Sequence, residues 1–235
     1  MGKGGGQRRA RPGGRGRADA GPRLPAGRHG LPREFVARNQ RERIVTALVD
    51  TVAEKGYNDT TVADITKAAA VSRRTFYEHF TGKEECFLAA YDMVVEHIRA
   101  AMVVAAGAFE EWPQKVRAAL ATLLRFLAGE PELARLCLIE PIAAAGEIGA
   151  RHRATMQGAV EMLRAGRPAH AGARPLPETT EEAVVGGIAA LIVRELGAGR
   201  AADLEKQLPQ LVELVLAPYL GAEEAERQAQ EPTPA

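Results

Sequence analysis

The sequence is poor in the side chains on which many enzyme mechanisms depend. Ser72 is the only serine among the 235 residues, and neither Cys86 nor Cys137 lies in a nucleophile motif. A serine hydrolase needs a free serine beside a histidine, whereas Ser72 stands where a helix cap is expected. The five histidines lack metal-ligand spacing, and no glycine-rich phosphate loop follows a strand. We therefore expect a protein that is not an enzyme, with no catalytic residue, no metal site and no cofactor.

Other scarcities narrow the class of protein. Two cysteines cannot form a disulfide framework and fit a reduced cytoplasm. No apolar run approaches the roughly 20 residues of a membrane helix, and the basic N-terminus lacks the apolar segment of a signal peptide. Hydrophobic residues make up 46% of the chain but aromatic residues only 5%, which suits helices packed with Ala, Leu and Val. We see no repeat and no convincing strand, so we predict an all-α cytoplasmic protein without a membrane partner.

The most informative stretch is residues 60–87, TTVADITKAAAVSRRTFYEHFTGKEECF. Thr60 or Thr61 can cap a helix, and Thr61 and Asp64 have the spacing of a capping box, with Asp in place of Glu. The apolar residues of 62–69 then fall on one helical face. Residues 70 and 71 make a short connection to the next segment. The pattern predicts a short helix that ends in a tight turn.

A second short helix follows this turn. Ser72 is a good N-cap, and the helix should run through Phe80, with Phe76 four residues earlier on the same buried edge. Arg73, Arg74 and Tyr77 lie off that edge. Thr81 and Glu84 have the spacing of another capping box, which would start a third helix. Helix, tight turn and cationic helix form the helix-turn-helix pattern, in which the second helix enters the DNA major groove.

These residues resemble the DNA-binding signature of the tetracycline-repressor (TetR) family of bacterial regulators. The close resemblance covers about residues 41–87, where many positions match in the right order. It implies an all-helical homodimer in which a connecting helix joins the DNA-binding domain to a helical ligand-binding domain. We accordingly predict a disordered basic arm (1–32), a helix-turn-helix domain (33–82), an effector-binding and dimerisation domain (83–221) and a frayed tail (222–235).

The resemblance also implies roles for single residues. Arg73 and Arg74 would lead the recognition helix and reach base edges, where Arg reads guanine with two donors; the alternative is a solvated surface pair. The predicted DNA-binding set is Thr61, Ser72, Arg73, Arg74, Thr75, Tyr77, His79 and Lys83. Tyr77 and His79 would hold phosphate, although packing between helices is an alternative for both. Lys83 at a helix N-terminus is unfavourable unless an anion such as a DNA phosphate lies there.

Two positions depart from the family pattern. The family usually has Gly in the turn where this chain has Ala70, which requires either a negative φ there or some backbone strain. Many members carry Arg where this chain has Ala63, so we expect one base contact fewer from the first helix of the motif.

Charge is divided unevenly along the chain. Residues 1–83 hold 17 Lys/Arg and 8 Asp/Glu, a net charge of +9, whereas residues 84–235 hold 14 and 22, a net charge of −8. The half with the helix-turn-helix therefore attracts phosphate. Residues 1–32 are low-complexity Gly, Arg and Pro, which cannot bury enough apolar surface to order. Such an arm is either passive or adds phosphate and minor-groove contacts to DNA.

Helical patterns continue along the rest of the chain. Before the motif, residues 33–55 predict a helix that ends at Gly56. After it, helices are expected at about 83–106, 113–128, 131–140, 145–165, 180–196 and 202–220. Thr179 or Thr180 should cap the fifth of these, and Pro209 should kink the last. Residues 166–177 should form a loop.

The C-terminal half carries little motif. If it encloses an effector pocket, as the resemblance implies, the polar or polarisable residues to test first are His97, Trp112, His152 and Met156, each of which could equally be ordinary core or surface. Within AVVGGIAALI, residues 183–192, Gly186 and Gly187 each cost a helix roughly 1 kcal/mol relative to Ala. That cost suits close approach by another helix. We predict a dimer interface that contains Ala183, Gly186, Gly187 and Ala190.

Taken with the resemblance, these features predict a dimeric repressor bound to a palindromic operator in the nucleoid. A small-molecule effector would favour a spacing of recognition helices that no longer fits the operator. The alternative is a DNA-binding regulator or activator without a small-molecule response. A sizeable apolar cavity would favour the repressor, and a collapsed pocket the alternative.

Overall fold

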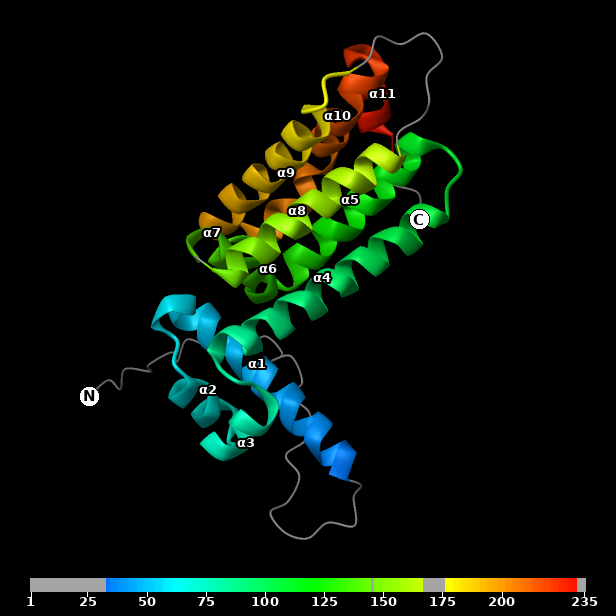
Figure 1. Ribbon diagram of the computed structural model, residues 1–235. Coiled ribbons are helices and arrows are strands. Elements are labelled where there is room, and N and C mark those ends of the chain that lie inside the picture. Colours follow the sequence, from blue (N-terminus) through cyan, green and yellow to red (C-terminus); the bar gives the residue numbers. More distant parts are fainter. Residues whose placement is uncertain (1–32, 145, 167–175, 232–235) are drawn as a thin grey trace, which may run out of the picture.

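The predicted all-α architecture is confirmed. A computed structural model describes residues 33–144, 146–166 and 176–231, and within these ranges it contains helices and no strand (Figure 1). The predicted basic arm, residues 1–32, lies outside the described residues. No helix in the described part of the chain is long and apolar enough to cross a membrane.

Three helices form a group at one end of the molecule, and α4 runs from this group along the remaining helices (Figure 1). Their bounds are α1 (Arg33–Asp59), α2 (Val62–Ala69), α3 (Arg73–His79) and α4 (Lys83–Gly107). Gly56 interrupts α1 with a φ of 81°, so regular helix ends where the sequence predicted. Thr60 Oγ1 then donates to the Gly56 carbonyl across 2.8 Å. Glycine reaches a positive φ without the Cβ clash of other residues, which is why the chain can turn here.

The other helices form a bundle beside α4 (Figure 1). They are α5 (Trp112–Gly129), α6 (Pro131–Leu138), α7 (Glu140–Ala143), α8 (Glu147–Gly166), α9 (Thr180–Gly197), the 3₁₀ helix η1 (Ala201–Gln207), α10 (Leu208–Leu220) and α11 (Ala222–Gln230). A proline stands in the first turn of α5, α6, α7 and α10. The first turn tolerates proline because its N–H would have no helical partner there.

Two expectations for this half were wrong, and one helix was not predicted. Pro209 starts α10 after η1 and does not kink a longer helix. Residues 222–230 form α11 and are not frayed, because Ala225 and Ala229 are buried in the core and Arg117 donates to the Gln228 carbonyl. The short helix α7, which begins at Glu140, was not predicted.

Two clusters of buried hydrophobic side chains hold the molecule together. The first joins the helix-turn-helix group to α4, α6 and α8, and it includes Ile44, Phe76 and Phe87 together with Leu136 and Ile148. The second lies among α5, α9, α10 and α11. One continuous core therefore crosses residue 83, where we predicted a domain boundary. The helix-turn-helix group is braced by the bundle and not merely tethered to it.

Candidate nucleic-acid interface

The start of α2 carries the predicted capping box. Thr61 Oγ1 accepts from the Asp64 N–H at 3.2 Å, and the Asp64 carboxylate accepts from the Thr61 N–H at 2.9 Å and from its hydroxyl at 2.6 Å. Lys55 Nζ lies 3.0 Å from the same carboxylate. The Thr61 hydroxyl and then Lys55 stabilise the charged form, which lowers the pKa of Asp64 to about 2. The carboxylate that closes the capping box therefore stays ionised at physiological pH.

The turn between α2 and α3 has a positive φ at Ala70, which is the strained of the two conformations considered for this position. Ala70 has φ 51° and ψ 48°, and it is the one non-glycine residue with positive φ in the described part of the chain. The Ala70 N–H donates to the Lys67 carbonyl at 3.2 Å and the Val71 N–H to the Thr66 carbonyl at 3.1 Å. These two bonds form a Schellman motif, which normally has Gly at the position of Ala70.

The candidate recognition helix α3 is capped and anchored as predicted. Ser72 Oγ accepts from the Thr75 N–H at 3.0 Å and lies 2.9 Å from the Thr75 hydroxyl. Phe76 and Phe80 are buried, with ring centroids 5.8 Å apart. This pair fastens the inner edge of α3 to the core.

The outer face of α3 presents cations to solvent. Arg73 and Arg74 are both exposed. Arg74 Nε lies 3.1 Å from a Glu78 carboxylate oxygen, but the Arg74 side chain is 89% exposed, so this pair contributes little and is easily exchanged for another anion. Tyr77 is also exposed. A phosphate backbone or a guanine edge could reach all three side chains without unfolding the helix.

Two predicted phosphate ligands already have partners within the chain. His79 is half-buried and its Nε2 lies 3.4 Å from Gln40 Oε1 on α1. Lys83 Nζ donates to the Tyr57 carbonyl at 2.7 Å and lies 4.1 Å from the centroid of the Tyr57 ring. Desolvation lowers the pKa of Lys83. These contacts favour packing for His79 and leave both phosphate roles as predictions.

The start of α4 differs from the prediction. Gly82 is the N-cap, and Glu85 rather than Glu84 reaches back, accepting from the Thr81 N–H at 2.6 Å and from its hydroxyl at 2.7 Å. Both bonds lower the pKa of Glu85. The capping box of Thr81 and Glu84 was therefore wrong by one residue, because the helix begins one residue later than a Thr81 cap would require.

Three arginines of α1 have different neighbours in the structure. Arg38 pairs loosely with Glu42 at 3.9 Å on the surface. The Arg41 guanidinium lies 4.9 Å from the Phe80 ring centroid. Arg43 instead reaches the turn between α2 and α3, where it donates to main-chain carbonyls.

The sequence analysis missed the role of Glu140. Its carboxylate accepts from the Tyr57 N–H at 2.8 Å, and it thereby ties α7 to the C-terminal end of α1, just after the turn at Gly56. The Tyr57 ring also meets Phe87 edge-on, with centroids 4.9 Å apart. No local pattern could indicate this contact, because 83 residues separate its two partners.

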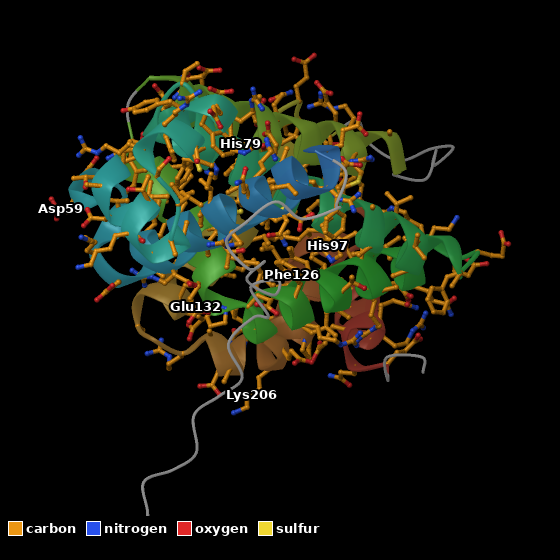
Figure 2. The ribbon with its side chains drawn as sticks, turned by 90° about the horizontal axis from the view of Figure 1, so that it is seen from below. Asp59, His79, His97, Phe126, Glu132 and Lys206 are labelled. Carbon is orange, nitrogen blue, oxygen red and sulfur yellow. The ribbon has the colours of Figure 1, made fainter. Side chains whose placement is uncertain are left out.

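The predicted effector residues have separate neighbours. His97 is exposed and lies 5.7 Å from the Phe126 ring (Figure 2), and Trp112 packs 5.0 Å from the Tyr219 ring. His152 is half-buried, with Nδ1 3.3 Å from the Tyr91 hydroxyl, and burial lowers its pKa. Met156 is partly buried one turn later on α8. A cavity of about 410 Å³ lies beside α8 and α9, and none of these four residues lines it. Its lining residues are Arg164, Leu176, Glu178, Glu181 and Glu182.

The predicted dimer residues fall into two groups. Ala183, Gly186 and Ala190 are exposed and share one face of α9. Gly187 is half-buried, and a Cβ placed on it would lie 3.4 Å from Leu214 of α10. Gly187 therefore serves close packing within this chain, whereas the other three leave a smooth outer surface.

A capped, cationic helix that follows a two-residue turn defines a helix-turn-helix protein, and sequence comparison agrees. A sequence model described as "Bacterial regulatory proteins, tetR family" matches residues 44–90. A Bacillus subtilis protein described as an uncharacterized HTH-type transcriptional regulator, YxbF, is 33% identical over 92 residues, which are 39% of this chain and 24% of that protein. Residues 44–90 thus carry the sequence pattern of the TetR family, and the matches span only about a quarter to a third of the length of the curated relatives.

Structural similarity extends much further along the chain. The fatty acid degradation regulator FadR from Bacillus halodurans superposes with a TM-score of 0.67 at 18% identity, covering 77% of this chain and 96% of FadR. FadR from Bacillus subtilis in complex with stearoyl-CoA gives 0.65 at 19% identity, covering 75% and 97%. At such identities the likeness concerns the fold alone.

Proposed function

We propose that this protein is a dimeric, sequence-specific DNA-binding transcriptional regulator that reads its operator with α3. The observation that carries the proposal is the pair of exposed arginines, Arg73 and Arg74, at the start of a helix held by the Ser72 cap and the buried Phe76. The Arg73 and Arg74 side chains are exposed, whereas the helix that carries them is held in place. This combination suits bidentate reading of guanine in the major groove. The positive charge of residues 1–83 would draw this face to phosphate.

The dimer follows from the geometry of DNA. Two half-sites of a palindrome lie about 34 Å apart, so two recognition helices must be linked. The exposed small residues Ala183, Gly186 and Ala190 would let α9 of a second copy approach closely, in a twofold arrangement.

We further propose that the regulator is a repressor released by a small molecule. The similarity of its fold to that of the FadR solved with stearoyl-CoA supports a ligand response. The second candidate is a regulator without such a response. The cavity beside α8 and α9 favours it, because three of its five lining residues are glutamates and its lining is therefore polar. Release of bound DNA by stearoyl-CoA would support the first candidate, whereas binding that persists through a metabolite screen would support the second.

The test is selection of duplexes from a random DNA pool, followed by affinity measurements on the selected duplex and on a scrambled one. Arg73→Ala and Arg74→Ala should each cost about 1–3 kcal/mol on the selected duplex and less on the scrambled one. Arg125→Ala, which removes an exposed charge from α5, is the control and should change neither affinity. Failure to enrich any sequence would overturn the proposal, and equal losses on both duplexes would assign the arginines to phosphate.

A further inference from the structure

We infer that Arg43 of α1 is a positioning residue for DNA recognition: its guanidinium holds the turn between α2 and α3 in a conformation that Ala70 disfavours. The inference rests on the proposed DNA binding and adds a residue that does not itself touch DNA. Three observations carry it, namely the contacts of Arg43, the backbone of Ala70 and the short distance in sequence from that turn to Arg73.

The guanidinium lies against the C-terminus of α2. Its Nη2 donates to the Ala69 carbonyl and, at 3.2 Å, to the Ala70 carbonyl. The Schellman motif already occupies the carbonyls of Thr66 and Lys67, so Arg43 takes two further acceptors at the same helix end. A cation here also complements the negative end of the helix dipole.

The backbone at Ala70 explains why this support matters. An alanine at φ 51° brings its Cβ close to the following carbonyl, a clash that glycine avoids. The Ala70 carbonyl is one of the two that Arg43 binds. The hydrogen bonds of Arg43 therefore favour the left-handed turn over the extended or right-handed alternatives that alanine would otherwise adopt.

The turn controls where α3 points. Only Ala70 and Val71 separate the end of α2 from the Ser72 cap, so a change of backbone angle at Ala70 moves the whole of α3. Phe76 and Phe80 hold the inner edge of α3 against the core, whereas the turn sets the direction in which the helix starts. Arg73, at the end of α3 nearest the turn, would then lose its alignment with base edges before the helix itself unfolds.

A phosphate contact is the competing role for Arg43. Its half-buried position and the two main-chain carbonyls bound by Nη2 argue against that role, because a phosphate at this nitrogen would have to displace both bonds. Arg38, five residues earlier on α1, has an exposed side chain and no bond to the turn. It is a matched control for loss of one positive charge from the same helix.

The experiment is a double-mutant cycle of Arg43→Met and Ala70→Gly, with Arg38→Met as the control. The probes are a duplex selected by the wild-type protein from a random pool and a scrambled duplex of equal length. Arg43→Met should weaken binding to the selected duplex about tenfold and to the scrambled duplex far less, since hydrogen bonds from a charged donor are lost. Ala70→Gly should restore much of that loss, because glycine adopts the turn unaided.

The outcomes separate the possible roles. Wild-type affinity for Arg43→Met, or a loss that Ala70→Gly leaves unchanged, would overturn the inference. A loss on both duplexes, with a salt slope about 0.9 shallower, would assign Arg43 to phosphate. If Arg43→Met does not fold, Arg43→Lys keeps the charge but not the guanidinium fork, and the same rescue by Ala70→Gly is expected.

The cycle also has a readout without DNA. Melting temperatures of the four variants should be non-additive, with Arg43→Met lowering the temperature less when residue 70 is Gly than when it is Ala. Additive melting temperatures would overturn the role of Arg43 even if no duplex were selected. Failure of the wild-type protein to select any duplex would refute only the proposed function.

Discussion

The two halves of the molecule begin their helices in different ways. In the helix-turn-helix group, side chains cap α2 and α3: Thr61 and Ser72 each accept from a main-chain N–H three residues later. In the bundle, α5, α6, α7 and α10 have a proline in the first turn and no side-chain cap bond. A capping hydroxyl bonds one particular main-chain N–H and so defines the residue at which the helix begins. A proline in the first turn is compatible with a helix start but does not define its position.

This difference matches how far each half resembles other proteins. The family match is confined to residues 44–90, although the fold likeness to FadR covers 77% of the chain at 18% identity. A surface that reads DNA needs defined side chains at defined angles. A bundle needs only apolar residues of suitable volume at its buried positions, and many sequences provide them.

The largest effect should come from removing the anchor of α3. Phe76 is fully buried, so Phe76→Ala should cost about 3–5 kcal/mol of unfolding free energy and abolish selective DNA binding. Leu211→Ala in α10, also fully buried, should cost about 2–5 kcal/mol. Hydrogen exchange should rise first at α2 and α3 in the former variant and at α9 to α11 in the latter. The same pattern in both variants would show that the halves unfold as one unit.

Substitutions at Gly186 and Gly187 compare the exposed face of α9 with the face that packs against α10. A Cβ placed on Gly186 has no neighbouring atom within 4 Å, so the Gly186→Leu monomer should fold, but overpacking between copies should cost about 1–3 kcal/mol and shift sedimentation toward monomer. Gly187→Leu should lower the melting temperature instead, because it meets Leu214. If Gly186→Leu sediments as the wild type does, the dimer does not use this face of α9.

Glu140 tests how the bundle braces the helix-turn-helix group. Glu140→Ala leaves the Tyr57 N–H without its acceptor, which should cost about 1–2 kcal/mol and speed hydrogen exchange at Tyr57 and in α2. Glu132→Ala removes an exposed carboxylate from the neighbouring helix α6 and should leave that exchange unchanged. Equal exchange in all three proteins would mean that the buried core alone holds α2 against the bundle.

The smallest effect compares two helix starts directly. Ser72→Ala should cost about 1 kcal/mol, since the cap bond to the Thr75 N–H is lost. Thr179→Ala should change the melting temperature little, because Thr179 makes no cap bond at α9. Equal destabilisation by the two changes would contradict the distinction between capped and uncapped starts.

The expectation of a Thr179 or Thr180 cap shows where local patterns mislead. Both the sequence before α3 and that before α9 contain a hydroxyl residue at a helix start, yet only Ser72 has the extended backbone that points its oxygen at the helix. Thr179 has φ −84° and ψ 0°, close to helical values. The residue type permits a cap, and the backbone that leads into the helix decides whether one forms.

The sequence by itself determined what depends on neighbours within a few residues. The Thr61–Asp64 capping box, the Ser72 cap, the turn at Gly56 and the buried pair of Phe76 and Phe80 all follow from spacings of three or four residues. Each is a choice between helix and turn that the chain makes locally. These same features were enough to indicate the family.

Only the tertiary structure decided which partners the polar side chains would find. Arg43 binds the turn 26 and 27 residues away, Lys83 binds the Tyr57 carbonyl 26 residues back, and Glu140 binds the Tyr57 N–H across 83 residues. The burial of Ala225 and Ala229 likewise made a helix of an acidic, polar tail. Such contacts depend on how helices pack, and a charged side chain has the same local signature whether it ends at solvent, at phosphate or at a main-chain carbonyl.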